Sequence, residues 1–252
     1  MSIEKSFDTN KTAVINPSQV YEKSDIVLKA CIINFSYKIM DALKEDNLIE
    51  YTGISLKSVA IEYPVYRFIG TDIGVVQATV GAPIASGHIE EVGHVFSCKK
   101  FVMFGSCGGL DKTLSPNFLI VPTHAYRDEG VSYHYAPASD YIEIKNCKKV
   151  GEILKQNNID FVYGKTWTTD AFFRETKRNM EARKNEGCIA VEMEVSACQA
   201  VADFREYEFY NFLYRADNLD SSSWERGILG LISLDDRLKN FFIALQIAKN
   251  II

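Results

Sequence analysis

Two acidic segments of the sequence carry side chains that could act on a sugar or on a leaving group. The first, Glu192-Met193-Glu194, closes a short apolar run over residues 189–191 and opens a region with helical spacing. A carboxylate held there could accept hydrogen bonds from both hydroxyls of a ribose cis-diol, since it offers four lone-pair sites. The other interpretation is that Glu194 only complements the dipole of the helix that follows.

The second acidic segment is Arg215-Ala216-Asp217-Asn218, directly after an apolar run over residues 209–214. An aspartic acid in this position can donate a proton if burial and hydrogen bonding raise its pKa from about 3.9 toward neutrality. The alternative is a surface aspartate that begins a turn with the polar residues after it. Local sequence leaves both interpretations open.

Two glycine-containing junctions could bring backbone amides close to an anion or a sugar. Gly105-Ser106-Cys107-Gly108-Gly109 follows the apolar residues 101–104, and Gly81-Ala82-Pro83 separates another apolar run from a helical segment. Small residues allow close approach, and a helix N-terminus offers free N–H groups with a partial positive charge. Neither junction is a GxGxxG or Walker loop, so a tight turn out of a buried strand is the alternative.

These four segments need a scaffold in which strands and helices alternate. Runs rich in Val, Ile and Phe predict strands over residues 65–69, 75–80, 101–104, 118–121, 161–167, 189–192 and 209–214. Helical spacing of apolar residues predicts helices over residues 29–46, 84–97, 148–156, 176–184, 194–204 and 234–251. Such alternation is typical of an α/β fold, in which ligands bind beyond the carboxyl ends of strands.

Length and composition narrow the range of partners. The 252 residues are 47% apolar and show no linker or repeat, which predicts one domain over residues 1–252. A net charge of −5 argues against binding nucleic acid or an acidic membrane surface, and the apolar runs fall far short of the ~20 residues that cross a bilayer. A small-molecule partner is favoured.

The same sequence features predict a cytoplasmic protein without a metal site. The first ten residues, MSIEKSFDTN, lack the apolar segment of a secretory signal. Six cysteines without CxxC spacing predict reduced, mostly buried thiols. The four histidines form no HExxH motif and no His/Cys cluster, so we expect no bound metal.

Taken in order, these segments resemble the nucleoside phosphorylase superfamily, which includes uridine phosphorylase, hexameric purine nucleoside phosphorylase and methylthioadenosine nucleosidase. The resemblance covers nearly the whole chain and rests on residues 81–83, 105–109, 127–137, 169–173, 192–194 and 217. It implies an α/β domain with a central mixed β-sheet flanked by helices. It also implies a homo-oligomer, with a hexamer built from dimers favoured, and no metal or organic cofactor.

The resemblance further implies a reaction and a set of roles. Inorganic phosphate would cleave the N-glycosidic bond of a nucleoside, giving the free base and ribose 1-phosphate. Glu194 would bind the ribose hydroxyls with the support of Glu192, and Asp217 would protonate or hydrogen-bond N7 of a leaving purine. The other substrate-binding residues would be Ser106, Cys107, Gly108, Phe172 and Met193. Uridine phosphorylases generally lack the acid at position 217 and carry a Gln-x-Arg pair that is absent after Phe173, so purines are favoured over pyrimidines.

Two phosphate-binding arginines of the family are missing. The family's Gly-Asp-Pro-x-Arg motif corresponds to Ile15-Asn16-Pro17-Ser18-Gln19, and Met103 stands where a second arginine usually precedes the glycine-rich turn. Gly81, Ser106 and Gln19 are then the candidate positions for binding phosphate, with Arg67 or a residue of a neighbouring subunit as the alternative source of positive charge. Two other functions therefore stay open: a nucleosidase that uses water, and a nucleoside-binding protein without turnover.

Overall fold

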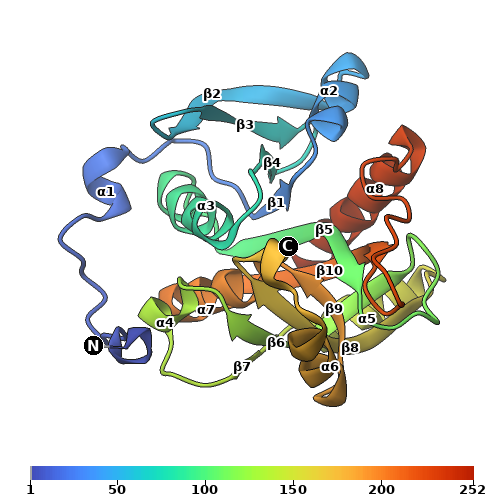
Figure 1. The fold of residues 1–252 in the computed structure, drawn as a ribbon. Coiled ribbons are helices and arrows are strands. Elements are labelled where there is room, and N and C mark those ends of the chain that lie inside the picture. Colours follow the sequence, from blue (N-terminus) through green and yellow to red (C-terminus); the bar gives the residue numbers. More distant parts are fainter. Residues whose placement is uncertain (1) are drawn as a thin grey trace.

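Strands from the whole length of the chain join one mixed β-sheet in the computed structural model, which describes residues 2–252 (Figure 1). The hydrogen-bonded order is β10-β6-β8-β9-β5-β1-β4-β3-β2, with β7 beside β6. The strands are β1 (Ala30–Asn34), β2 (Ile49–Lys57), β3 (Glu62–Phe68), β4 (Ile73–Gln77), β5 (Lys100–Gly109), β6 (Leu119–Asp128), β7 (Tyr141–Glu143), β8 (Phe161–Thr169), β9 (Cys188–Glu192) and β10 (Glu208–Asn218).

Helices cover this sheet, which confirms the predicted α/β fold with a central mixed sheet. The α-helices are α1 (Pro17–Val20), α2 (Tyr37–Glu45), α3 (Ala82–Val95), α4 (Ser132–Tyr135), α5 (Cys147–Gln156), α6 (Lys177–Asn185), α7 (Val195–Arg205) and α8 (Leu234–Ile251), and the 3₁₀ turns are η1 (Ile3–Lys5) and η2 (Phe172–Arg174). Helices α3 and α7 pack on each other, whereas α8 lies on β1 and β5 and contacts α2 and α5. Within residues 2–252, none of these helices combines the length and apolar character that crossing a membrane requires.

Part of the sheet forms a closed ring of strands, because β10 pairs with β5 as well as with β6. The ring consists of β10, β6, β8, β9 and β5. In the parallel β5–β10 pair, Gly108 lies opposite Asp217, and in the β5–β9 pair the same glycine lies opposite Val191. The closed arrangement therefore sets the ends of β5, β9 and β10 side by side. The glycine-rich junction and both acidic segments fall at these ends.

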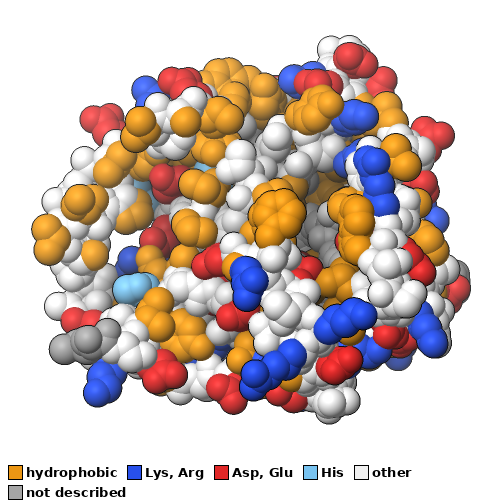
Figure 2. Space-filling model, viewed as in Figure 1, with side chains coloured by type: hydrophobic (Ala, Val, Ile, Leu, Met, Phe, Trp, Pro, Cys, Tyr) orange, Lys and Arg blue, Asp and Glu red, His pale blue; other side chains and the backbone are white. Residues whose placement is uncertain are grey.

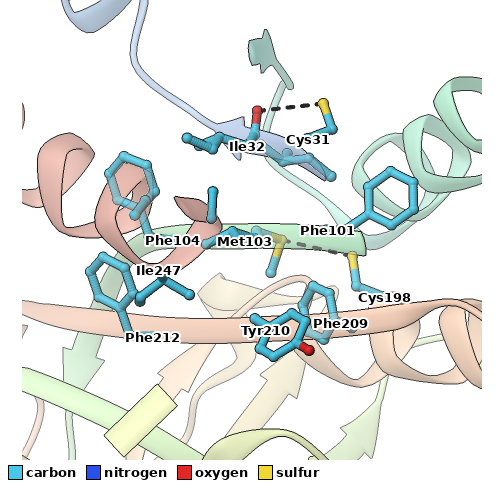
Figure 3. Packing of buried hydrophobic residues seen from close by; sticks show 14 of the residues in the cluster. Cys31, Ile32, Phe101, Met103, Phe104, Cys198, Phe209, Tyr210, Phe212 and Ile247 are labelled. Carbon is cyan, nitrogen blue, oxygen red and sulfur yellow. Dashed lines mark hydrogen bonds between the residues drawn. The ribbon is translucent and has the colours of Figure 1, made fainter. Parts of the chain in front are cut away.

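Aromatic side chains of the two central strands form the middle of the core (Figure 3). Phe104 of β5 and Phe212 of β10 stack with ring centroids 5.5 Å apart, and Ile247 of α8 packs into the same cluster. All six cysteines are free and buried, as predicted.

The first predicted helix, over residues 29–46, was wrong in its first part. Residues Ala30–Asn34 form β1, and only Tyr37–Glu45 is helical. Every residue of β1 is buried, because the strand lies between β4 and β5 and has both faces covered. A fully apolar strand shows no alternation, so its spacing cannot be told from that of a buried helix. The strand β2 was not predicted at all.

Candidate active site

A cavity of about 880 Å³ lies where β5, β9 and β10 end. Hydrophobic side chains gather around a hollow on the face drawn in Figure 2. Both predicted acids, Glu194 and Asp217, line the cavity. The other predicted substrate-binding residues line it too, namely Ser106, Cys107, Gly108, Phe172, Glu192 and Met193.

Glu194 occupies the N-cap position of α7 and is held by backbone amides. Its Oε1 accepts a hydrogen bond from the Gly81 N–H at 2.6 Å, and its Oε2 accepts one from the Met193 N–H at 3.3 Å. Burial raises the pKa of Glu194 to about 7, although both hydrogen bonds act to lower it. Each oxygen keeps lone pairs beyond its one backbone bond, so the group can accept hydrogen bonds from a ligand in the cavity.

Gly81 therefore hydrogen-bonds Glu194 and does not form a separate anion site facing the cavity. It lies just before α3 with φ at +121°, a conformation that suits glycine. The residue is not among those that line the cavity, and its N–H is already used by the carboxylate. The predicted phosphate contact of Gly81 has no free donor there.

Glu192 uses both of its oxygens inside the protein. Oε2 accepts hydrogen bonds from the N–H groups of Glu194 and Val195, each at 2.7 Å, while Oε1 accepts bonds from the hydroxyls of Thr166 and Thr168. Burial and the neighbouring Glu194 raise the pKa of Glu192 to about 8. These contacts fix the start of α7, so Glu192 positions Glu194.

Asp217 is the next-to-last residue of β10, beside the cavity, and is 9% exposed. Its Oδ2 accepts a hydrogen bond from the indole N–H of Trp224 at 2.7 Å. Burial raises the pKa of Asp217, while the Trp224 hydrogen bond and the charge of Arg215 oppose that rise. A carboxylic acid with a raised pKa next to a cavity is suited to donate a proton.

Aromatic rings and a further carboxyl group line the same cavity as Asp217. Phe172 and Phe173 lie with ring centroids 4.2 Å apart on η2, and Trp224 lies on the segment between β10 and α8. Glu175, Phe173 and Trp224 all line the cavity, yet the sequence interpretation gave none of the three a role and included Phe173 only in the 169–173 motif. For Glu175 a signal was present, because it lies only two residues beyond the end of the 169–173 motif.

Serine hydroxyls and one arginine form another part of the wall. Ser106 is exposed to the cavity, and Nη1 of Arg237 on α8 donates to the hydroxyl of Ser36 at 3.2 Å. Cys107 is buried, and its desolvation raises the pKa of the thiol well above the usual range. Arg237 carries no sequence signal, since arginine is common on the polar face of a helix.

Gln19 lies outside this site, and the structure corrects its predicted place. It belongs to the short helix α1, where its side chain accepts a hydrogen bond from the Asn16 N–H at 2.7 Å in a capping box. Helix α1 precedes β1 and packs against α3, and none of its residues lines the cavity, whereas Phe35, Ser36 and Ile39 after β1 do. Met103 does line the cavity and is buried, and it brings no charge.

Across residues 2–252, no group of three or more His, Cys, Asp or Glu side chains is arranged to hold a metal ion.

A sequence model of the phosphorylase superfamily matches residues 30–227. Purine nucleoside phosphorylase DeoD-type 1 from Shewanella oneidensis is 27% identical over 142 residues, which are 54% of this chain and 59% of that protein. The chain thus spans little more than half the length of the curated relatives it matches.

Two solved structures share the fold. Purine nucleoside phosphorylase from Toxoplasma gondii, in complex with immucillin-H, superposes with a TM-score of 0.73 at 18% identity, over 90% of this chain and 92% of that one. AMP nucleosidase from Bacteroides thetaiotaomicron gives a TM-score of 0.68 at 14% identity, over 89% and 90% of the two chains.

Proposed function

Because the chain belongs to the phosphorylase superfamily, we propose that it cleaves purine ribonucleosides with inorganic phosphate, releasing the free base and ribose 1-phosphate. The observation that carries the proposal is the shared cavity, which both Glu194 and Asp217 line. One carboxyl group is suited to hold a sugar and the other to donate a proton. We call the wall around Glu192 and Glu194 the ribose end, and the wall around Phe172, Glu175, Asp217 and Trp224 the base end.

At the ribose end, ionised Glu194 would accept hydrogen bonds from the 2′ and 3′ hydroxyls while Met193 packs against the sugar. The electron pair of the glycosidic bond leaves with the base, so positive charge develops on the ribose ring. A sugar held in one orientation lowers the entropic barrier, and nearby negative groups stabilise the developing charge. The backbone hydrogen bonds to Glu194 support this role, because they fix the carboxylate before substrate arrives.

At the base end, neutral Asp217 would transfer its proton to N7 of the purine. The electron pair released at C1′ moves to N9 at the same time, so the purine departs as a neutral base and Asp217 becomes a carboxylate. The raised pKa of Asp217 supports this step, since the acid must hold its proton before the bond breaks. Because the proton acceptor is a purine nitrogen, the acid favours purines over pyrimidines.

Phosphate would bind beside the wall formed by Ser36, Ser106 and Arg237, all of which line the cavity. One guanidinium and two hydroxyls offer hydrogen-bond donors to an anion, and charge-assisted bonds are the stronger ones. A phosphate oxygen would form the new bond to C1′ as the bond to the base breaks. Arg237 thus supplies a positive charge that Met103 and Gln19 cannot.

Base release measured with and without phosphate tests this proposal. We expect adenosine or inosine to be converted much faster with phosphate, with ribose 1-phosphate as the sugar product. Arg237→Met should raise the KM for phosphate about 10-fold or more, because one charge-assisted contact is lost. Lys239→Met is the matched control, since Lys239 is exposed on the same helix. Equal rates in both conditions, with free ribose as product, would exclude phosphorolysis.

Hydrolysis is the second candidate, and a specific observation favours it. Met103, at one position where the family carries a phosphate-binding arginine, lines the cavity without a charge, and Gln19, matched to the other position from sequence, lies outside the cavity. The same assay separates the two reactions. A third outcome, thermal stabilisation by a nucleoside with no base released in either condition, would indicate a binding protein without turnover.

The proposal includes a homo-oligomer built from dimers, a cytoplasmic location and activity without an added cofactor. Apolar surface at the cavity mouth supports association, because Phe173 is 89% exposed in the single chain. Light scattering measures the mass of the assembly. Activity that persists after dialysis against a chelator would support the absence of a metal requirement.

A further inference from the structure

We propose that Glu175 determines base specificity: together with Asp217 it makes the cavity select 6-aminopurine nucleosides over 6-oxopurine nucleosides. This inference rests on the proposed function and deepens it, because it names the class of purine that the base end accepts.

The position of Glu175 is the first observation. The residue ends the η2 turn that carries Phe172 and Phe173, and its side chain lines the cavity that Asp217 also lines. Apolar side chains occupy the same wall, among them Met180, Leu219 and Trp224. A purine ring that stacks in this part of the cavity would therefore meet two carboxyl groups and apolar side chains, and the cavity is also lined by Lys177 and by the serines at 221–223.

The second observation is that the Glu175 carboxyl group has no partner of its own. Within residues 2–252 it makes no hydrogen bond and no ion pair, although Lys177 lines the cavity as well. Asp217, in contrast, is hydrogen-bonded to the Trp224 indole. A half-buried carboxyl group without a partner costs free energy in the empty protein, and a ligand that hydrogen-bonds it recovers that cost.

The two carboxyl groups also influence each other electrostatically. Burial and the charge of Asp217 raise the pKa of Glu175 to about 7, and burial raises the pKa of Asp217. Two neighbouring acids lose their protons one after the other, and the first charge makes the second proton harder to remove. With one proton, the pair presents one O–H donor and one carboxylate acceptor to the ligand.

The edge of the purine decides which ligand fits this pair. A 6-aminopurine presents an acceptor at N7 and a donor at its amino group, whereas a 6-oxopurine presents acceptors at both N7 and O6. A purine whose N7 accepts a hydrogen bond from Asp217 favours the arrangement in which the proton of the pair lies on Asp217, and both kinds of purine offer this contact. The ionised Glu175 can then accept from a 6-amino group, but it repels the lone pairs of a 6-oxo group. Accepting a 6-oxopurine would require a second proton on the pair.

Values of kcat/KM for adenosine and inosine, measured at saturating phosphate and neutral pH, test the assignment. The wild-type protein should favour adenosine by about 10- to 100-fold, the range expected for one hydrogen bond to a charged group. In Glu175→Gln this ratio should fall by a similar factor, because an amide can offer its oxygen to a 6-amino group or its N–H to a 6-oxo group. Glu181→Gln, an identical change at an exposed position of α6, should leave the ratio unchanged.

A substrate series on the wild-type protein keeps the assignment testable if Glu175→Gln does not fold. Purine riboside carries hydrogen at C6, so it loses the contact to Glu175 without gaining a repulsive group. Its kcat/KM should lie between those of adenosine and inosine. An active wild-type enzyme that cleaves all three alike, or prefers inosine, would overturn the role of Glu175 and leave the proposed function standing. Release of no base from any of them would overturn both.

Discussion

The ribose end and the base end of the cavity differ in how their side chains are held. At the ribose end, Glu192 and Glu194 are 5% and 8% exposed, and backbone N–H groups around the β9–α7 junction hydrogen-bond their carboxyl groups. At the base end, Asp217 is on β10 and 9% exposed, but the aromatic residues Phe172 and Trp224 are 51% and 58% exposed and lie on a short 3₁₀ turn and on an irregular segment.

This contrast separates what every substrate shares from what distinguishes one substrate from another. The ribose is common to all nucleosides, and a group that must contact it in one geometry is best fixed by strands and a helix. The base varies, and irregular segments can change residues without disturbing the sheet beneath them. Changes at the ribose end should therefore affect all ribosides, and changes at the base end should affect only some leaving groups.

Asp217→Asn should produce the largest effect and should depend on the leaving group. The amide cannot protonate N7, so kcat for adenosine should fall about 100- to 10,000-fold, the range typical of a lost general acid. A nitrophenyl riboside, whose leaving group departs as an anion, should lose far less activity. Release of adenine and of nitrophenol measures both rates. An equal loss on the two substrates would place Asp217 outside the proton transfer.

Glu194→Gln should produce the second-largest loss of activity, and the size of this loss should depend on the sugar instead of the base. Gln offers one acceptor oxygen where the carboxylate offers two, and its N–H₂ would face the N–H of Gly81 or Met193. We expect kcat/KM for ribosides to fall about 10- to 100-fold, and for 2′-deoxyribosides clearly less, because they lack one of the hydroxyls. Adenosine and 2′-deoxyadenosine should be compared in wild type and variant. The same loss on both would contradict the contact to the 2′ hydroxyl.

The ribose end could be located from sequence because its chemistry adjoins two recognisable boundaries. An apolar run ends at Val191 and a helical pattern begins after Glu194, which places the acids at the carboxyl end of a strand. Gly108 was found in the same way. The structure adds the reason for glycine there: a Cβ would lie 2.8 Å from a Val191 methyl and 3.3 Å from Oδ1 of Asp217.

The base end and the anion wall could be predicted only in part. Asp217 and Phe172 lie next to strand ends, but Trp224 reaches Asp217 from a segment without helical or strand periodicity. Arg237 reaches the cavity only because α8 folds back over β1 and β5. Gln19 was placed wrongly because a proline motif was matched without knowing that β1 begins only at Ala30. Such contacts are set by tertiary packing and not by local pattern.

The stability of the ribose end should depend on pH, with an effect of about 1 to 3 kcal/mol. The pKa of Glu194 is raised from its ordinary value of 4.5 to about 7, so the protonated form favours the folded state. This contribution is present below about pH 4.5 and is lost as the pH rises through 7. The glutamine in Glu194→Gln does not titrate, so the variant has no such pH-dependent contribution. The free energy of unfolding of wild type should therefore decline relative to that of the variant between pH 5 and 8.

Urea denaturation at several pH values in that range measures this difference. Glu181→Gln, at an exposed site, should follow the wild-type curve. Parallel curves for wild type and Glu194→Gln would show that the carboxyl group is not strained by burial, and the contrast between the two ends would then rest on geometry alone.

Trp224→Phe should change the reaction rate least of the substitutions considered, and only the step at the base end should be affected. Phenylalanine keeps a ring at the cavity mouth but removes the indole N–H that donates to Oδ2 of Asp217. That hydrogen bond lowers the pKa of Asp217, so its loss should raise the pKa and keep the acid protonated to higher pH. Burial and Arg215 still act on Asp217 in the variant, which limits the change. The falling limb of the pH–rate profile for adenosine should therefore shift to higher pH, so that at a pH on that limb the variant is about 2- to 5-fold faster than wild type. The ratio of the rates for 2′-deoxyriboside and riboside should stay constant. A change in that ratio would mean that Trp224 acts on the sugar, and the two ends of the cavity would not be independent.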